Sequence, residues 1–235
     1  MKVEIWSDVM CPFCYIGKRR FEKAVQELPF GKDIQVEWKS FQLDPSITNE
    51  PGKNVNQYLA ERKGVSVQQA QEMNDYVTKM AAEVGLQYDF SKAVVANSFD
   101  AHRFSHLAAQ KGGGDAAEES LFKAYFTEGK NIADHDTLAA LGVQIGLDSA
   151  EVKQTLQTDA FASQVRQDID EAGALGIQGV PFFVMNRKYA VSGAQSVEVF
   201  KQALDRAYTE WKAEKDKNKL TIVEGETCTP DGDCK

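Results

Sequence analysis

The chain has 235 residues, of which 43% are hydrophobic and 26% charged, and its formal net charge is −8 at pH 7. These fractions are ordinary for a globular protein, and the length allows one large domain or a domain with an insertion. The acidic balance argues against nucleic acid as a partner, because phosphate binding needs clustered Lys and Arg. The basic triplet Lys18-Arg19-Arg20 is too short to change this and is expected on a solvated helix face. No apolar run approaches the roughly 18 residues of a membrane span, so no membrane partner is expected.

The N-terminal part of the chain carries the pattern strand, helix, strand. A short apolar strand is expected at 3–6, and helical spacing of apolar residues predicts a helix over 14–28. Strict alternation predicts a half-buried strand over 34–38, with Ile34, Val36 and Trp38 on its buried side. Two cysteines separated by two residues, Cys11 and Cys14, stand at the start of the helix. This combination is the opening unit of a thioredoxin fold.

Residues 51 to about 157 are expected to be almost entirely helical, because signals that start and stop helices recur there. Helix starts are expected at Ser66 (with Gln69), Ser98, Asp115 (with Glu118) and Asp148 (with Glu151). Apolar stripes follow these starts, and we interpret them as the core of a helical insertion. The stripes include Met73, Tyr76, Val77, Met80, Val84, Leu121, Phe122, Tyr125 and Phe126.

The chain then returns to β character. A helix over 161–172 precedes a strand after Pro181, a hairpin partner at 189–192 and a last helix capped by Ser196. The fold class is therefore α/β, a thioredoxin-like fold interrupted by a helical insertion domain. The expected limits are 1–50 and 158–216 for the two parts of the thioredoxin-like domain, 51–157 for the insertion and 217–235 for a polar tail.

Cys11 and Cys14 are the expected catalytic pair. Disulfide exchange needs a thiolate that attacks and a nearby thiol that resolves the mixed disulfide. The first sulfur lies at the positive end of the helix, which favours an anion, so Cys11 is assigned as nucleophile and Cys14 as resolving thiol. Pro12 suits the first helical turn, since its missing N–H has no partner to lose there.

The alternative interpretation of the pair is half of a zinc site. Such a site needs a second pair of ligands, and the spacing of Cys228 and Cys234 is wider than is usual in zinc knuckles. We therefore expect no metal.

Pro181 follows Val180 directly before an expected strand. It is either an ordinary trans proline that opens an edge strand or the cis-proline that thioredoxin-like proteins place opposite their CxxC pair. The order of the surrounding elements favours the cis-proline, which would keep metals away and present backbone groups to a substrate peptide.

Together these motifs resemble the DsbA family, and within it the FrnE-like branch of cytoplasmic bacterial proteins, from about residue 3 to residue 210. The motifs are Ser7-Asp8 before Cys11-Pro12-Phe13-Cys14, Phe41 to Pro45, Ala101-His102-Arg103, Gly179 to Phe183 and Gly193-Ala194-Gln195. The resemblance implies a thioredoxin domain split by a helical domain, with substrate contacts from Pro12, Phe13, Val180 and Pro181. DsbA has His where this chain has Phe13, which offers a thiolate neither charge nor donor. We therefore expect a pair less oxidising than that of DsbA and suited to reduction or isomerisation.

Two further groups are candidates for a role. Cys228 and Cys234 flank a Pro-Asp-Gly turn and form either an accessory redox pair or an incidental exposed disulfide. His102 and His106 have the spacing of metal ligands on a helix but lack a third ligand. The resemblance suggests instead that His102 and Arg103 face the catalytic domain.

The expected function is thiol–disulfide exchange with protein or small-molecule disulfides, as reductase or isomerase, with no bound cofactor and with glutathione or a dithiol protein as turnover partner. One alternative is a glutathione-dependent enzyme resembling the 2-hydroxychromene-2-carboxylate isomerases or kappa-class transferases, which typically carry Ser at the position of Cys11. Another is a chaperone-like binding module. The N-terminus lacks the pattern of a secretory signal, which predicts a cytoplasmic protein.

Overall fold

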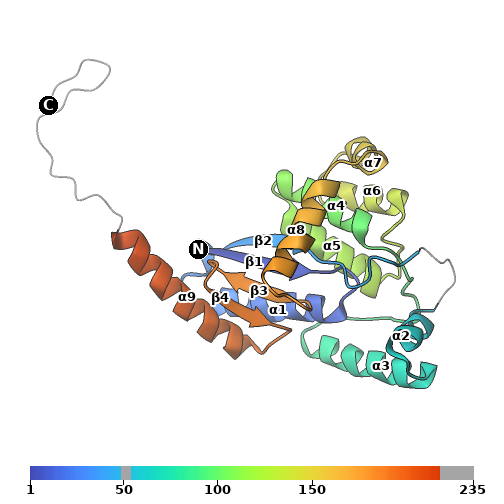
Figure 1. Ribbon diagram of the computed structural model, residues 1–235, viewed down its shortest axis with the longest axis horizontal. Helices are drawn as coiled ribbons and strands as arrows, with labels where there is room; N and C mark the ends of the chain where they lie inside the picture. Colours follow the sequence, from blue (N-terminus) through green and yellow to red (C-terminus); the bar gives the residue numbers. More distant parts are fainter. Residues whose placement is uncertain (49–53, 218–235) are drawn as a thin grey trace, which may run out of the picture.

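The computed structural model describes residues 1–48 and 54–217. In these residues four strands form one mixed sheet in the order β2-β1-β3-β4 (Figure 1). β1 (Lys2–Ser7) pairs in parallel with β2 (Gln35–Ser40), and β3 (Phe182–Met185) pairs antiparallel with β1 and with β4 (Tyr189–Ser192). This is the α/β, thioredoxin-like arrangement that the sequence predicts.

Helices make up most of the rest of the described chain. Their bounds are α1 (Pro12–Glu27), α2 (Val55–Lys63), α3 (Val67–Glu83), α4 (Phe99–Gln110), α5 (Gly114–Phe126), α6 (His135–Gln144), α7 (Ser149–Gln157), α8 (Ala162–Ala174) and α9 (Val197–Lys217), with a short 3-10 helix at Gly31–Asp33. Helices α2 to α7 all fall between β2 and α8, where the sequence predicts the helical insertion. The domain limits themselves stay a prediction.

Helices cover both faces of the sheet. α1 and α9 pack on one face, where Phe21, Phe183 and Phe200 make ring contacts of 4.6–5.8 Å between centroids. Aromatic pairs of this kind contribute about 0.5–1.5 kcal/mol each beyond the area they bury. α8 lies over the other face (Figure 1). It contributes Ala172 to a smaller cluster around the buried indole of Trp6.

The start of α1 belongs to a second core. Cys14, Tyr15 and Ile16 pack with the apolar residues of the helical insertion, which include Phe104 and Phe122, rather than with the sheet cluster. One helix therefore ties the insertion to the sheet.

Two of the expected helix starts differ from the structure. The capping bonds expected at Ser66 and Asp148 are present. Asp115, however, is not a cap, because α5 begins one residue earlier, after Gly113. Its carboxylate instead lies 3.3 Å from the ammonium of Lys18. Ser98 occupies the N-cap position of α4 without a capping bond from its side chain.

The burial expected for three residues is also wrong. Val36 is 40% exposed because β2 is an edge strand with no neighbour on its outer side in the described sheet. Met73 and Tyr76, assigned to a core stripe, are 41% and 63% exposed on α3. Both side chains are exposed because they line a cavity beside Cys11. None of the helices in residues 1–48 and 54–217 is long and apolar enough to cross a membrane.

The close approach of α1 to the loop before β3 requires a glycine at position 17. A Cβ atom there would lie 2.9 Å from Cγ of Pro181 and 3.4 Å from the ring of Phe183. The proline ring cannot rotate out of the way, so any larger residue must push the loop from the helix.

We expect Gly17→Ala to lower the free energy of unfolding by about 1–3 kcal/mol, because overpacking outweighs the better helix propensity of alanine. Urea denaturation measures this change. Gly173→Ala in α8 is the matched control, since a Cβ there meets nothing within 4 Å. That variant should gain up to about 1 kcal/mol. A gain of stability in both variants would contradict the close approach.

Candidate active site

Cys11 and Cys14 begin α1. Cys11 is the N-cap residue, and its amide donates a hydrogen bond of 2.9 Å to the carbonyl of Asp8. Pro12 takes the first helical position, and the first turn contains no acidic residue. Both cysteines carry free thiols and are buried. The positive end of the helix therefore acts on the Cys11 sulfur without a carboxylate from its own first turn to oppose it.

The environment of Cys14 keeps that thiol protonated. Burial raises its pKa well above the ordinary value, and the neighbouring Cys11 raises it further, while Ser7 and the backbone of Asp8 oppose the shift only in part. Cys14 is thus a poor nucleophile until Cys11 has formed a mixed disulfide with the substrate. This is the arrangement that a resolving thiol requires.

The loop before β3 lies against the pair. The peptide bond between Val180 and Pro181 is cis. The Cys11 thiol donates a hydrogen bond of 3.4 Å to the carbonyl oxygen of Val180. Pro181 itself lies behind this contact, beside Gly17.

A cavity of about 630 Å³ opens beside Cys11. Four of the predicted site residues, Cys11, Pro12, Phe13 and Val180, line it together, whereas Pro181 does not. Its other walls come from α2, α3, the loop around Leu43 and the end of α5. The exposed residues of the α3 stripe, Met73 and Tyr76, belong to this wall and not to a core.

Tyr88 is a site residue that the sequence analysis missed. Its hydroxyl donates a hydrogen bond of 2.7 Å to the carbonyl of Pro12, inside the cysteine motif. Its ring stacks on Phe126 with 4.6 Å between centroids, and Tyr15 stacks on Phe122 at 4.9 Å. Tyr88 therefore holds the first turn of α1 against the helical insertion. It lies outside any helix or strand, so no periodic pattern could have singled it out.

His102 links the two parts of the structure. Its Nε2 donates a hydrogen bond of 3.0 Å to the carbonyl of Phe41 and lies 3.6 Å from the buried carboxylate of Asp8. Burial lowers the pKa of His102, but Asp8, Glu118 and the Phe41 carbonyl outweigh burial, so the pKa is raised. Asp8 also accepts a hydrogen bond of 2.7 Å from the amide of Leu43, in the cavity wall.

Arg103 does not join this contact. Its guanidinium donates to four backbone carbonyls between Thr155 and Ala160, where α7 ends and the chain turns toward α8. His106 pairs instead with Ser40 and Asp168. The described ranges hold no group of three or more His, Cys, Asp or Glu side chains placed to bind a metal. Cys228 and Cys234 lie outside the described residues.

The family model of the DSBA-like thioredoxin domain matches residues 2–205. The chain belongs to this family. A solved structure described as a probable DsbA oxidoreductase of Streptomyces coelicolor is 40% identical, covers 100% of this chain and 98% of its own, and has a TM-score of 0.85. The protein YwbO of Bacillus subtilis, described as uncharacterized, is 31% identical over 86% of this chain and 94% of its own. The FrnE-like branch stays a prediction.

Two solved structures with lower sequence identity share the fold of this chain. The cytosolic disulfide reductase DsbM of Pseudomonas aeruginosa is 18% identical, with a TM-score of 0.61 over 92% of this chain and 100% of its own. A 2-hydroxychromene-2-carboxylate isomerase is 14% identical, with a TM-score of 0.66 over 93% of this chain and 100% of its own. Because reductase and isomerase both have this fold, the fold alone does not choose between them.

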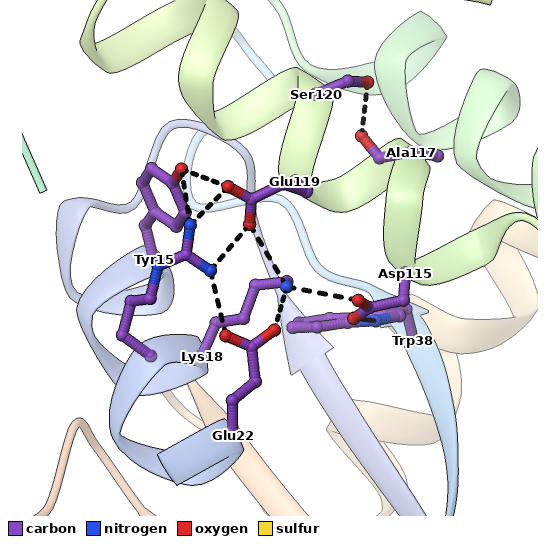
Figure 2. A network of polar contacts seen from close by, with 9 residues as sticks. Tyr15, Lys18, Glu22, Trp38, Asp115, Ala117, Glu119 and Ser120 are labelled. Carbon is purple, nitrogen blue, oxygen red and sulfur yellow. Dashed lines mark hydrogen bonds and ion pairs between the residues drawn. The ribbon is translucent and has the colours of Figure 1, made fainter. Parts of the chain in front are cut away.

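A polar network fixes α1 to α5 beyond the site (Figure 2). Lys18, expected on a solvated face, is 1% exposed, and its ammonium lies 3.2 Å from Glu119 and 3.3 Å from Asp115, with Glu22 also in contact. Glu119 also accepts a hydrogen bond of 2.6 Å from the hydroxyl of Tyr15. Lys18 and Arg19 of the basic triplet therefore connect α1 to carboxylates of α5 that are distant in the sequence, whereas Arg20 bonds the carbonyl of Ala194.

Glu119→Gln tests this network. Burial alone would raise the pKa of Glu119, but the bonds from Arg19 and Tyr15 and the nearby Lys18 outweigh it, so the pKa is lowered. At pH 7 we expect the variant to lose about 1–3 kcal/mol of unfolding free energy. The pKa of Glu119 in the folded protein lies below its value of about 4.3 in the unfolded chain. The stabilisation by Glu119 is therefore fully present above about pH 4.3 and is lost as the pH falls through the folded pKa.

The measurement is urea denaturation of both proteins from pH 7 down to about pH 3. Asp115→Asn is the matched control, since it removes one carboxylate from the same lysine where the side chain is 62% exposed. It should cost less than about 1 kcal/mol. A loss in Glu119→Gln that stays constant across this pH range would show that the carboxylate contributes no charge interaction.

Proposed function

We propose that this DsbA-like protein exchanges thiols and disulfides through Cys11 and Cys14, acting as a reductase or isomerase on protein or small-molecule disulfides. The Cys11 thiolate attacks one sulfur of the substrate disulfide, which forms a mixed disulfide and releases one substrate thiolate. The Cys14 thiol loses its proton and attacks the Cys11 sulfur, which releases the second thiolate. The substrate gains two electrons and the cysteine pair becomes a disulfide.

The observation that carries this proposal is the position of the Cys11 sulfur. It lies at the positive end of α1, faces the backbone of Val180 and lines the cavity, so an incoming disulfide can meet it there. Regeneration needs an external reductant, and glutathione or a dithiol protein has the required chemistry. No bound cofactor takes part in either step.

The preference for reduction or isomerisation rests on Phe13. A strongly oxidising pair requires a stabilised thiolate in the reduced protein, and the side chain of Phe13 supplies no hydrogen bond or charge to one. DsbM, named a cytosolic disulfide reductase, is a precedent with the same fold. A cytoplasmic location would keep the pair reduced at rest.

The reduction potential of the Cys11–Cys14 pair tests the proposal. We expect a value of about −270 to −200 mV, within the range of thioredoxin and glutaredoxins, measured by alkylation and mass shift in graded glutathione buffers. A Cys228→Ser/Cys234→Ser background removes any contribution from the tail cysteines. A potential near −120 mV would indicate a DsbA-like oxidant instead. A pair that cannot be cycled would refute the proposed chemistry.

Single variants separate the roles of the two thiols. Cys11→Ser should abolish insulin reduction, because the attacking sulfur is lost, whereas Cys14→Ser should accumulate a mixed disulfide that intact-mass measurement detects. Stoichiometric glutathione binding by Cys14→Ser without dithiol cycling in the wild type would favour the glutathione-dependent isomerase or transferase. Suppression of aggregation that survives Cys11→Ser would favour the chaperone-like module.

The role of the tail cysteines is tested separately. If the reduction potential of the Cys11–Cys14 pair is the same with and without Cys228 and Cys234, the tail pair is incidental.

A further inference from the structure

Exposed apolar side chains gather around the Cys11 cavity. Nine large hydrophobic residues are exposed in the described chain, and four of them, Phe13, Leu43, Met73 and Tyr76, line this cavity. Apolar surface left in contact with water gains nothing from folding, and its concentration in one place marks a binding surface. The wall therefore suits an apolar group of the substrate.

One buried polar group in this wall has no partner. Tyr125 is 2% exposed, lines the cavity from the end of α5, and its hydroxyl makes no hydrogen bond to the described residues. Fully enclosed side-chain N and O atoms without a hydrogen-bond partner occur in the described chain only in Glu4, Ser7 and Glu118. The hydroxyl of Tyr125 is thus not sealed in the core and opens on the cavity.

The neighbours of Tyr125 leave its proton available. Burial raises its pKa, and the Asp8 carboxylate and Tyr58 raise it further, so the hydroxyl stays neutral. Asp8 is occupied by the backbone amides of Leu43 and Met10, and the hydroxyl of Tyr58 donates to Asp44. A substrate that fills the cavity excludes water from this hydroxyl, and an acceptor on the substrate avoids the cost of leaving the hydroxyl buried and unpaired.

The charges of the cavity argue against a strongly anionic occupant. Arg62 is already paired with Asp44 and bonded to the carbonyl of Leu43. Lys63 is the one cation lining the cavity without an ion-pair partner among the described residues. A compound with two carboxylates, such as glutathione, would leave one of them unmatched beside an apolar wall. A neutral peptide segment meets no such penalty.

We propose that Tyr125 determines substrate specificity, by donating a hydrogen bond to a backbone carbonyl of a peptide disulfide whose bulky apolar side chain, next to the cysteine, fills the cavity. The inference rests on the proposed exchange chemistry and names its substrate class. Tyr125 recognises the peptide backbone, and the wall of α2 and α3 recognises the side chain. Cys11 attacks the disulfide held between them.

The test compares three substrates with the full-length protein. Two are peptide disulfides identical except for Phe or Ala next to the cysteine, and the third is 2-hydroxyethyl disulfide, which has no peptide backbone. We expect the wild type to favour the Phe peptide over the Ala peptide by about tenfold in kcat/KM, as partial burial of an aromatic ring allows. Tyr125→Phe should lower the ratio of peptide to 2-hydroxyethyl disulfide rates by about threefold to tenfold, the effect of one hydrogen bond.

Matched variants separate recognition from folding. Tyr208→Phe removes a tyrosine hydroxyl on α9 that bonds Asp33 outside the cavity, and it should leave that ratio unchanged. Met73→Glu places a charge in the apolar wall and should abolish the preference for the Phe peptide. Val143→Glu, at an exposed position on α6, should not.

Each contrary outcome is distinct. If Tyr125→Phe slows all three substrates equally, the hydroxyl has only a structural role and the inference is wrong. If the wild type cycles 2-hydroxyethyl disulfide but treats the two peptides alike, the apolar subsite is refuted and the exchange chemistry stands. If no substrate is cycled, the proposed function itself fails.

Discussion

The start of α1 packs into one core and the remainder of the same helix into another, and the active site depends on this division. Cys14 and Tyr15 are surrounded by the aromatic core of the helical insertion, while Phe21, farther along the helix, packs on the sheet. A helix is rigid over this length, so its N-terminus is fixed where the two cores meet. The Cys11 sulfur is thereby held opposite the backbone of Val180.

This placement gives the two thiols of one short motif different chemistry. The end of the helix offers unpaired amides and a positive potential to the first sulfur, whereas burial disfavours charge on the second. A separation of roles therefore needs no additional catalytic side chain. The hydrogen bond from Tyr88 to Pro12 and the carboxylates around Lys18 keep the helix in this position, the first at its tip and the second nearly two turns farther on.

The cavity beside Cys11 shows how stability and function compete in the same helices. α3 has the apolar spacing of a core helix, yet its outer stripe residues Met73 and Tyr76 stay in contact with solvent. The inner residues of that helix, such as Val77 and Ala81, are buried and anchor it. Surface that could have been closed in a core is thus left open next to the nucleophile, where a substrate can cover it.

The sequence by itself determined the local chemistry and the order of the elements. The CxxC pair at a helix start and the capping residues Ser66 and Asp148 act through neighbours a few residues away, and so they can be identified from spacing. Contacts between distant segments could not be identified in this way. Lys18 looks solvated until α5 brings Glu119 to it, the carbonyls that Arg103 binds lie more than 50 residues away in the chain, and Tyr88 has no pattern at all. Only the tertiary structure decided which apolar faces are closed and which polar groups are paired, because burial and pairing depend on what the folded chain places opposite each residue.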